Sequence, residues 1–326
     1  MARRRWWLIG GAALSCTCLG TGLVFLRGCA TEHSRPVGHG NLTFDVSADG
    51  SKIVFTAEDR GGRDLFWLDR KSGQIKALTN SLDYELSPAF SPDGRRIVFT
   101  RGKRGVRADQ LCITELVPPR GIDQLTDADE NIASPTFTPD GQSVIFSLET
   151  QYRWGGLASS WNEAGALVLM NLQTNERKFL VSEDKLAHDA AVSPDGKLLA
   201  WRDVRGLCLA ELDQVDAPRV VSKSGHSTTF SPDGRQLAMV AGTYIPDFHV
   251  EIVPVGGGQA KKVLNTDGAM QVRFLPDGRL LVLREFWRDG GFGEPTRGLW
   301  EMDQDGKNAR EVIPEATLKD PMRKSK

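Results

Sequence analysis

The sequence predicts an all-β protein: a six-bladed β-propeller of four-stranded antiparallel blades, preceded by an N-terminal transmembrane or signal helix. Three observations predict the propeller. A turn motif, clearest as Ser-Pro-Asp-Gly, occurs six times, and its glycines lie 44, 47, 55, 38 and 44 residues apart. Alternating apolar residues follow every copy, as in a β-strand. A spacing of this size suits one four-stranded blade per repeat.

The motif has a local physical explanation. Proline fixes φ at the first corner of a type I turn, Asp tolerates the second corner, and Gly takes the left-handed conformation that restarts the next strand. Ala48 replaces the proline in the first copy. The six copies occupy the segments Phe44–Gly50, Ala89–Gly94, Thr136–Gly141, Ala191–Gly196, Thr229–Gly234 and Arg273–Gly278.

The blades are expected to close into a ring, because an open stack would leave two bare sheet faces. No spare strand is visible to latch the first blade to the last. The residue four positions before the turn Asp is small in the middle copies, but it is Asp45 in the first and Arg273 in the last. We predict that these two side chains pair across the closing joint.

The N-terminus predicts export and membrane attachment. Residues 1–28 combine an Arg cluster (Arg3–Arg5) with an uncharged, mostly apolar stretch from Leu8 to Leu26, long enough to cross a bilayer. The charge bias places the propeller on the outer side of the cytoplasmic membrane, periplasmic or extracellular. An uncleaved anchor is favoured; the alternatives are a lipoprotein modified at Cys29 or Cys16, and ordinary cleavage.

The remaining boundaries follow from composition. Residues 29–40 read as a linker, 41–314 as the propeller and 315–326 as a disordered basic tail. The net charge of −1, with no basic excess, argues against a nucleic-acid partner. Cys112 and Cys208 occupy matching strand contexts two blades apart, so we expect two buried thiols and no disulfide. No phosphate-cradling loop precedes a helix, and no cofactor is predicted.

Aromatic insertions mark one face of the predicted ring as the working surface, because the Pro-Asp-Gly turns all lie on the other. A partner-binding role is expected for them. A small satellite core within each loop, or a sugar-stacking platform, are the alternatives. The candidates are Tyr152, Trp154 and Trp161 in the third blade, Phe286, Trp287 and Phe292 in the sixth, and Tyr244 and Phe248 in the fifth.

His188, Asp189 and His226 begin the fourth and fifth blades on the same face and complete the candidate binding set. A metal site there would require further ligands, and Glu85 is the only acidic candidate at a similar position, so no metal is predicted. A channel lactonase would require several carboxylate or amide ligands. Only one of the equivalent channel positions is acidic: Thr43, Ser87, Ser134, Asp189, Ser227 and Gln271. No catalytic residue is assigned.

The pattern Phe-Ser-Pro-Asp-Gly, an Ile-x-Phe strand and a closing Leu-Thr, spread over residues 42–313, resembles the WD-like repeats of the TolB-type propellers. The resemblance covers the propeller alone; in TolB an α/β domain comes first, whereas here only Gly28–Gly40 separate the anchor from the first blade. It implies a role with an envelope lipoprotein. We therefore expect a non-catalytic, membrane-tethered propeller that binds a protein, peptide, lipoprotein or cell-wall component. The alternatives are a metal-dependent hydrolase or lactonase working in the channel, and a sensor domain.

Overall fold

The computed structural model describes residues 42–59, 62–102, 109–117, 121–127, 130–153, 162–243, 247–286 and 296–322, all within one compact unit. The predicted anchor and linker, residues 1–40, lie outside these ranges. Within the described ranges, no helix is long and apolar enough to cross a membrane.

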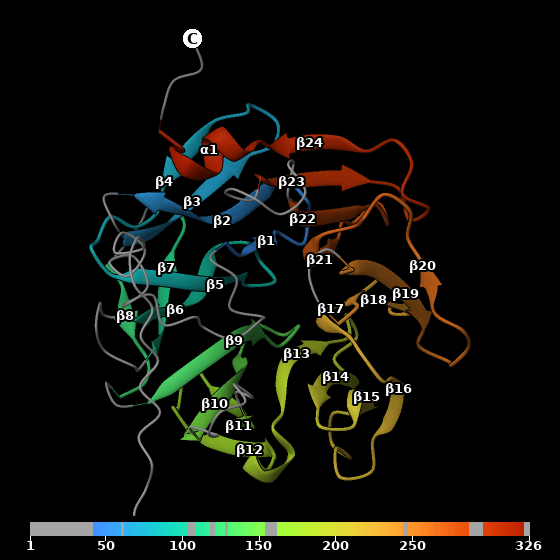
Figure 1. Cartoon of the computed structure of the whole chain (residues 1–326). Helices are drawn as coiled ribbons and strands as arrows, with labels where there is room; N and C mark the ends of the chain where they lie inside the picture. Colours follow the sequence, from blue (N-terminus) through green and yellow to red (C-terminus); the bar gives the residue numbers. More distant parts are fainter. Residues whose placement is uncertain are drawn as a thin grey trace, which may run out of the picture. The chain divides into compact units, whose positions relative to one another are not determined.

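Six antiparallel blades of four strands follow one another along the described chain and surround a central axis (Figure 1). A single parallel bridge between Arg63 and Tyr84 joins the first two blades into one eight-stranded sheet. The first three blades consist of β1 (Phe44–Val46), β2 (Lys52–Asp59), β3 (Gly62–Asp69) and β4 (Ile75–Ala77); β5 (Tyr84–Phe90), β6 (Arg96–Gly102), β7 (Asp109–Glu115) and β8 (Asp123–Gln124); and β9 (Asn131–Phe137), β10 (Ser143–Arg153), β11 (Asn162–Asn171) and β12 (Arg177–Val181). The last three consist of β13 (His188–Val192), β14 (Leu198–Asp203), β15 (Gly206–Glu211) and β16 (Arg219–Ser222); β17 (His226–Phe230), β18 (Gln236–Ala241), β19 (His249–Pro254) and β20 (Lys261–Lys262); and β21 (Ala269–Phe274), β22 (Leu280–Phe286), β23 (Thr296–Met302) and β24 (Arg310–Ile313). The predicted all-β fold is confirmed.

The core of the ring lies between the blades. The described residues contain six hydrophobic clusters, one at each joint between neighbouring blades. Strand β2 shows how the sequence builds them: Ile53 and Phe55 face the joint with the sixth blade, and Val54 faces the joint with the second. All three are almost completely buried. The two-residue period of a strand thus supplies two joints at once.

The Pro-Asp-Gly turns share a hydroxyl–carboxylate network that the turn geometry alone did not require. In the second blade, Ser91 Oγ donates to Asp93 Oδ1 at 2.5 Å and accepts from the Arg96 amide at 2.9 Å, while Gly94 has φ 67°. The first, third, fourth and fifth copies repeat the network through Ser47, Thr138, Ser193 and Ser231. The sixth copy has Leu275 instead, and there the Arg279 guanidinium binds Asp277.

Neighbouring turns also touch. A Cβ added to Gly50 would lie 2.9 Å from Pro276 Cδ, so the turn of the first blade fits only as glycine against the turn of the sixth. Looser contacts of the same kind place Pro92 beside Gly141 and Pro194 beside Gly234. We call the face that carries these turns the turn face, and the opposite face the mouth face.

The ring closes through side chains. Arg273 Nε lies 3.1 Å from Asp45 Oδ1, which confirms the predicted pair across the closing joint. Beside it, the Gln271 amide makes two hydrogen bonds with the Phe44 backbone, accepting from N at 3.0 Å and donating to O at 2.8 Å. Strand β1 pairs with β2, so within the described strands the joint holds no strand exchanged between the two blades.

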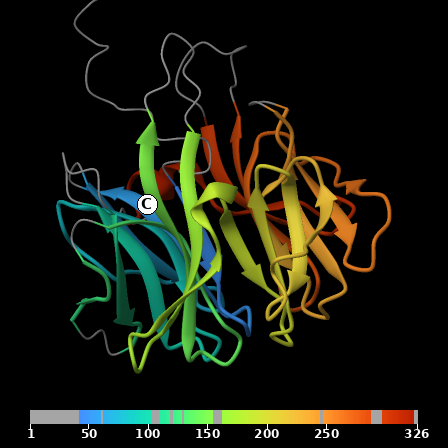
Figure 2. The ribbon, with the colours of Figure 1, turned by 90° about the horizontal axis from the view of Figure 1, so that it is seen from below.

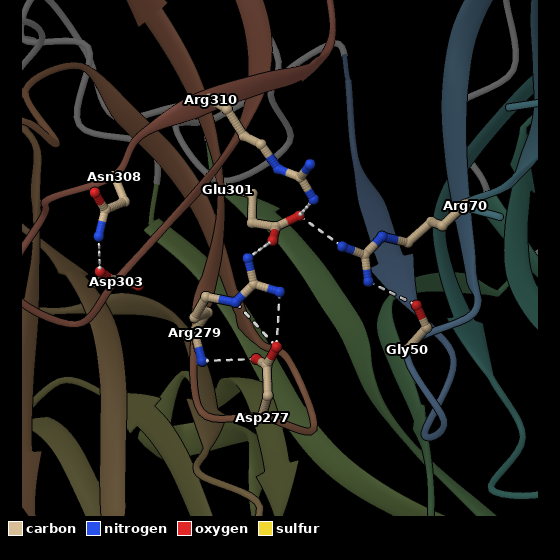
Figure 3. Close-up of polar contacts among 8 residues, drawn as sticks. All are labelled: Gly50, Arg70, Asp277, Arg279, Glu301, Asp303, Asn308 and Arg310. Carbon is tan, nitrogen blue, oxygen red and sulfur yellow. Dashed lines mark hydrogen bonds and ion pairs between the residues drawn. The ribbon is translucent and has the colours of Figure 1, made fainter.

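Glu301 closes the same joint nearer the turn face. Its carboxylate is 1% exposed and is contacted by three guanidinium groups, those of Arg70, Arg279 and Arg310 (Figure 3). Arg70 belongs to the first blade; its Nη2 lies 2.5 Å from Glu301, and its Nη1 donates to the Gly50 carbonyl at 2.7 Å. One buried carboxylate of the sixth blade thereby holds a turn of the first.

The prediction of a disordered tail over residues 315–326 is wrong for its described part, residues 315–322. Residues Glu315–Lys319 form a short helix, α1, and Leu318 is 3% exposed within the hydrophobic cluster of the closing joint. The cluster also contains Leu42, at the start of the described chain. The many charged residues of the tail hid this single apolar anchor, because one leucine carries no periodic signal.

Candidate functional site

A cavity of about 230 Å³ lies in the central channel. It is lined by the innermost strand of each blade, from β1 to β21, because four-stranded blades place their first strands nearest the axis. Each of these strands begins at the mouth face and ends at a Pro-Asp-Gly turn. All six repeats therefore contribute to the wall of the channel.

Four innermost strands have an unusual backbone at the same repeat position. Ser87, Ser134, Asp189 and Ser227 have φ between 48° and 54°, in the left-handed region. A regular strand does not include this conformation, and the pairing register shifts at each of the four positions. Only small or short polar side chains occur there. All four residues line the cavity.

These positions link neighbouring blades around the channel. The Ser87 amide donates to Thr43 Oγ1 at 2.9 Å, across the first joint. At the fifth joint the Val272 amide donates to Ser227 Oγ at 3.2 Å, and Gln271 continues the series to Phe44. Of the six positions that the sequence predicts to be equivalent, all line the cavity, and four share this backbone conformation; Thr43 and Gln271 do not. What their sequence did not reveal is the positive φ.

Asp189 links three blades. Its Oδ1 accepts from Ser134 Oγ at 3.0 Å, and its Oδ2 faces the Ser227 amide at 3.4 Å. The fourth blade thereby contacts the third and the fifth through one carboxylate. This role in joining blades accompanies its place in the predicted binding set.

His226 is buried at the mouth-face end of β17. It is 6% exposed and packs edge-on against Phe248, with ring centroids 5.1 Å apart. Its Nε2 has no hydrogen-bond partner, and neither does the buried Thr228 Oγ1 two residues later. Burial lowers the pKa of His226; Asp189 opposes this change, and Arg202 adds to it. His226 is therefore a neutral, polar wall residue of the cavity.

The three predicted mouth residues come together. His188 and Asp189 both act electrostatically on His226. His188 itself is half-buried, and its Nδ1 lies 3.0 Å from the Leu186 carbonyl. Among the described residues no group of three or more His, Cys, Asp or Glu side chains is arranged to hold a metal ion. Glu85 is fully buried and bound to Arg101 and Thr79.

The predicted aromatic loops lie mainly outside the described residues. Trp154, Trp161, Tyr244, Trp287 and Phe292 are not described, and Tyr152 and Phe286 are described only as strand backbone. The hairpin that carries Tyr152 is the longest of the described strand pairs, with 11 residues in β10 and 10 in β11, and it rises from the mouth face (Figure 2). The prediction that Phe248 belongs to an aromatic surface is wrong: its side chain is 4% exposed and lies in the core.

The two propeller cysteines are free and buried, as predicted. Burial raises the pKa of Cys112 to about 11 and of Cys208 to about 12. Because the thiolate is the reactive form, neither is prepared for nucleophilic chemistry at neutral pH.

Comparison with known proteins supports the resemblance seen in the repeats. No family model matches the chain. A protein TolB homolog of Chlorobium chlorochromatii is 37% identical over 75 residues, which is 23% of this chain and 17% of that protein. The crystal structure of TolB from Acinetobacter baumannii matches 82% of this chain and 64% of its own, with a TM-score of 0.65 and 21% identity. The fold is that of a TolB-type propeller.

Enzymes share the same architecture. Oligogalacturonate lyase from Vibrio parahaemolyticus covers 82% of this chain and 76% of its own, with a TM-score of 0.58 and 16% identity. At these identities the structural matches show the fold alone. The matched segment spans about a sixth of the length of the Chlorobium relative, so that protein's whole activity does not transfer with it.

Proposed function

We propose that this chain is a non-catalytic interaction propeller that acts outside the cytoplasm. It binds a protein, a peptide or another envelope component, such as a lipoprotein or cell-wall fragment, at the mouth face. Its N-terminal segment, residues 1–28, tethers it to the membrane. The observation that carries this proposal is the channel mouth, where Asp189 and His226 line a polar cavity and His188 precedes Asp189 in the same strand. The long β10–β11 hairpin rises from the same face (Figure 2).

The repeat chemistry supports an assignment of function to this face. On the turn face, hydroxyl–carboxylate hydrogen bonds and left-handed glycines stabilise the backbone of the turns. On the mouth face, the blades differ in loop length, and the aromatic residues of the third and sixth blades interrupt the repeat. Irregular loops on a regular scaffold are where binding residues usually occur. The named TolB relatives, one of them a Tol-Pal system protein of Wolinella succinogenes, favour a protein partner.

Site-specific photo-cross-linking in intact cells tests the proposal. A photoreactive residue at Arg202 or Tyr152 samples the mouth face, and one at exposed Lys197 or Arg235 samples the turn face of the same ring. We expect reproducible partner adducts from the first pair that diminish when Trp154, Trp161 and Trp287 are replaced by Ala. Equal adducts from both faces, or adducts unchanged by the triple replacement, would contradict the proposal.

A second candidate is an enzyme working in the channel, favoured by the proximity of His188, Asp189 and His226 and by the lyase fold match. It predicts stoichiometric metal in the purified protein and loss of that metal in His188→Ala and His226→Ala variants. Elemental analysis separates this candidate from the binding role.

A further inference from the structure

We propose that His249, the Asp247 carbonyl and the Glu251 carboxylate form a pH-sensitive clasp at the base of the β18–β19 hairpin, on the mouth face of the fifth blade. The protonated imidazole holds this base closed, and loss of its proton releases it. The clasp is a conformational device that goes beyond the proposed binding role and does not depend on it.

Both ring nitrogens of His249 face oxygen atoms that accept hydrogen bonds. Nδ1 lies 2.7 Å from the Asp247 carbonyl oxygen, and Nε2 lies 3.2 Å from Glu251 Oε1. A neutral imidazole carries one N–H and serves only one of these oxygens, whereas the imidazolium serves both. The side chain is 13% exposed, so water has little access to replace a missing donor. The geometry therefore matches the protonated ring.

The hairpin base holds the Asp247 carbonyl in place. Gly242, on the other side of this base, has φ 121°, and a Cβ there would lie 2.8 Å from the Asp247 carbonyl oxygen. The two backbones are thus in close contact, which leaves this carbonyl little freedom to move away from Nδ1. The Asp247 side chain itself is exposed.

The strands that pack against β19 determine the charge around the imidazole. Strand β18 contains no charged residue, and β21 contains only Arg273, which is bound at the closing joint. Strand β20 consists of Lys261 and Lys262, and Lys262 lies opposite Glu251 in the antiparallel pair. Lys262 therefore offers the Glu251 carboxylate a second cation, across the strand pair.

The links to the neighbouring blades carry the other charged groups near the clasp. In the link to the sixth blade, Asp267 Oδ1 lies 3.5 Å from Lys262 Nζ. The link from the fourth blade packs on β18, where a Cβ on Gly225 would meet Met239 Sδ, and this link carries the exposed Lys223. The links thus add one acid and one base to the surroundings of the clasp.

The hairpin base is coupled to the channel wall through Phe248, the residue between the carbonyl and the imidazole of the clasp. Its ring packs against His226, with centroids 5.1 Å apart. Its carbonyl oxygen accepts from the Gly268 and Ala269 amides at 2.7 and 3.2 Å, at the start of the sixth blade. Movement of the hairpin base therefore changes contacts at the cavity and at the fifth joint together.

The two charge states of His249 differ in which cation Glu251 binds. The imidazolium donates to Glu251 and to the Asp247 carbonyl, and the clasp is closed. A neutral ring that keeps its N–H on the carbonyl turns a lone pair toward Glu251, and this carboxylate, 25% exposed, turns to Lys262. Histidine usually changes its charge between about pH 5 and 8. Because closure requires the bound proton, the clasp is closed at the acid end of this range and is released as the pH rises.

NMR and hydrogen exchange on the purified full-length protein test the proposal. Nitrogen-15 spectra of the imidazole report whether one or both ring nitrogens carry a proton, and the His249→Gln variant identifies the His249 signals. We expect both nitrogens to be protonated at about pH 5.5 and only one at about pH 7.5. Protection of the Gly268 and Ala269 amides, corrected for the intrinsic pH dependence of exchange, should be about fivefold higher at the lower pH.

Two variants and a control locate the switch. His249→Gln cannot change its charge, so it should remove the pH dependence of protection at the two amides. Glu251→Gln keeps the length of the side chain and removes its charge, so it should reduce the difference to less than about twofold. Glu211→Gln, at an exposed carboxylate on β15 of the fourth blade, is the matched control and should leave the difference unchanged. Melting temperatures establish that each variant is folded; if one is not, the other decides.

Several results would overturn the proposal. These are an unchanged protonation state of the His249 ring over about pH 5 to 8, equal protection of the two amides at both pH values, or a pH dependence that survives in His249→Gln. None of these measurements involves a partner. If mouth-face cross-links form and the ring does not titrate, only the clasp fails. If the clasp titrates and no cross-link forms, only the proposed binding role fails.

Discussion

Each innermost strand of the ring has two unlike ends. At the turn face, five of six strands end in the same bond between a hydroxyl and a turn Asp, as between Ser193 and Asp195. Toward the mouth face, four of the strands bulge at left-handed residues whose hydrogen-bond partners differ from joint to joint. The repeats of this chain therefore keep the same residues where the backbone of the turn requires them. They diverge where side chains from neighbouring blades meet around the cavity.

The largest loss of stability is expected at the charged pair of the closing joint. Arg273→Met leaves Asp45 without its guanidinium; because both side chains are partly exposed, the expected loss is about 3 kcal/mol, below that of a fully buried pair. Burial already raises the pKa of Asp45, and Arg273 opposes that change. A raised pKa gives stability that is greatest at low pH, so the loss should be largest near neutrality and should shrink in acid.

Urea denaturation at pH 7 and pH 4 measures this difference. Asp45→Asn combined with Arg273→Met should recover part of the stability, because no buried charge remains. Arg235→Met, at an exposed turn position, is the control. A loss equal at both pH values would show that packing, rather than charge, accounts for the effect.

A smaller loss is expected for Asp189→Ala, about 2 kcal/mol, because hydrogen bonds to two other blades disappear. The substitution also places alanine at φ 54°, which Asp tolerates better. Asp195→Ala changes the regular end of the same strand and should cost less. Chemical denaturation of both variants makes the comparison, and equal losses would remove the distinction between the two ends.

The regular end should respond uniformly. Ser193→Ala and Ser231→Ala each remove one hydroxyl–carboxylate network, at about 1 kcal/mol each, and the double variant should cost about their sum because the sites lie in different blades. Gln259→Ala, at an exposed position outside the turns, should change stability by less than about 0.5 kcal/mol. Unequal losses at the two equivalent serines would show that the repeats are not energetically alike.

The smallest effect is a pH dependence at a turn Asp. The Ser47 hydroxyl and the Ser51 backbone and hydroxyl lower the pKa of Asp49 to about 2. A lowered pKa gives stability that is complete above the unfolded value of about 4 and is lost as the pH falls toward 2. Asp49→Asn should therefore flatten the decline in stability between pH 4 and pH 2. Denaturation at several pH values measures this decline. An unchanged slope would mean that the turn bonds do not favour the ionised form.

The sequence predicted what recurs. Six turns gave the blade count, alternation gave the strands, and the exceptional Asp45 and Arg273 gave the closing pair. The positive φ of Ser87 and Ser134 was hidden because it depends on how the blade bulges, not on the residue alone; a serine before proline in both copies was the only trace.

Two other predictions from the sequence failed for a related reason. Phe248 sits in an apparently irregular loop, and only the neighbouring sixth blade converts it into core. Leu318 is an isolated apolar residue in a charged tail, and only the closing joint gives it a place to pack. In both cases the side chain is buried by contact with residues distant in the sequence. Local composition carries no information about such contacts.

Closure without an exchanged strand has a consequence for the gene. Every blade among the described residues is encoded as one uninterrupted stretch, from its innermost strand to its outermost. An in-frame duplication or deletion of one repeat therefore adds or removes a complete sheet, and no strand is left without its hydrogen-bonding partner. The contacts that must be rebuilt are those across the joint. They include side-chain contacts, such as Gln271 with Phe44, and backbone bonds, such as that of the Ala187 amide with the Gly165 carbonyl. A change in blade number by recombination at a repeat boundary therefore preserves the antiparallel pairing of strands within every described blade.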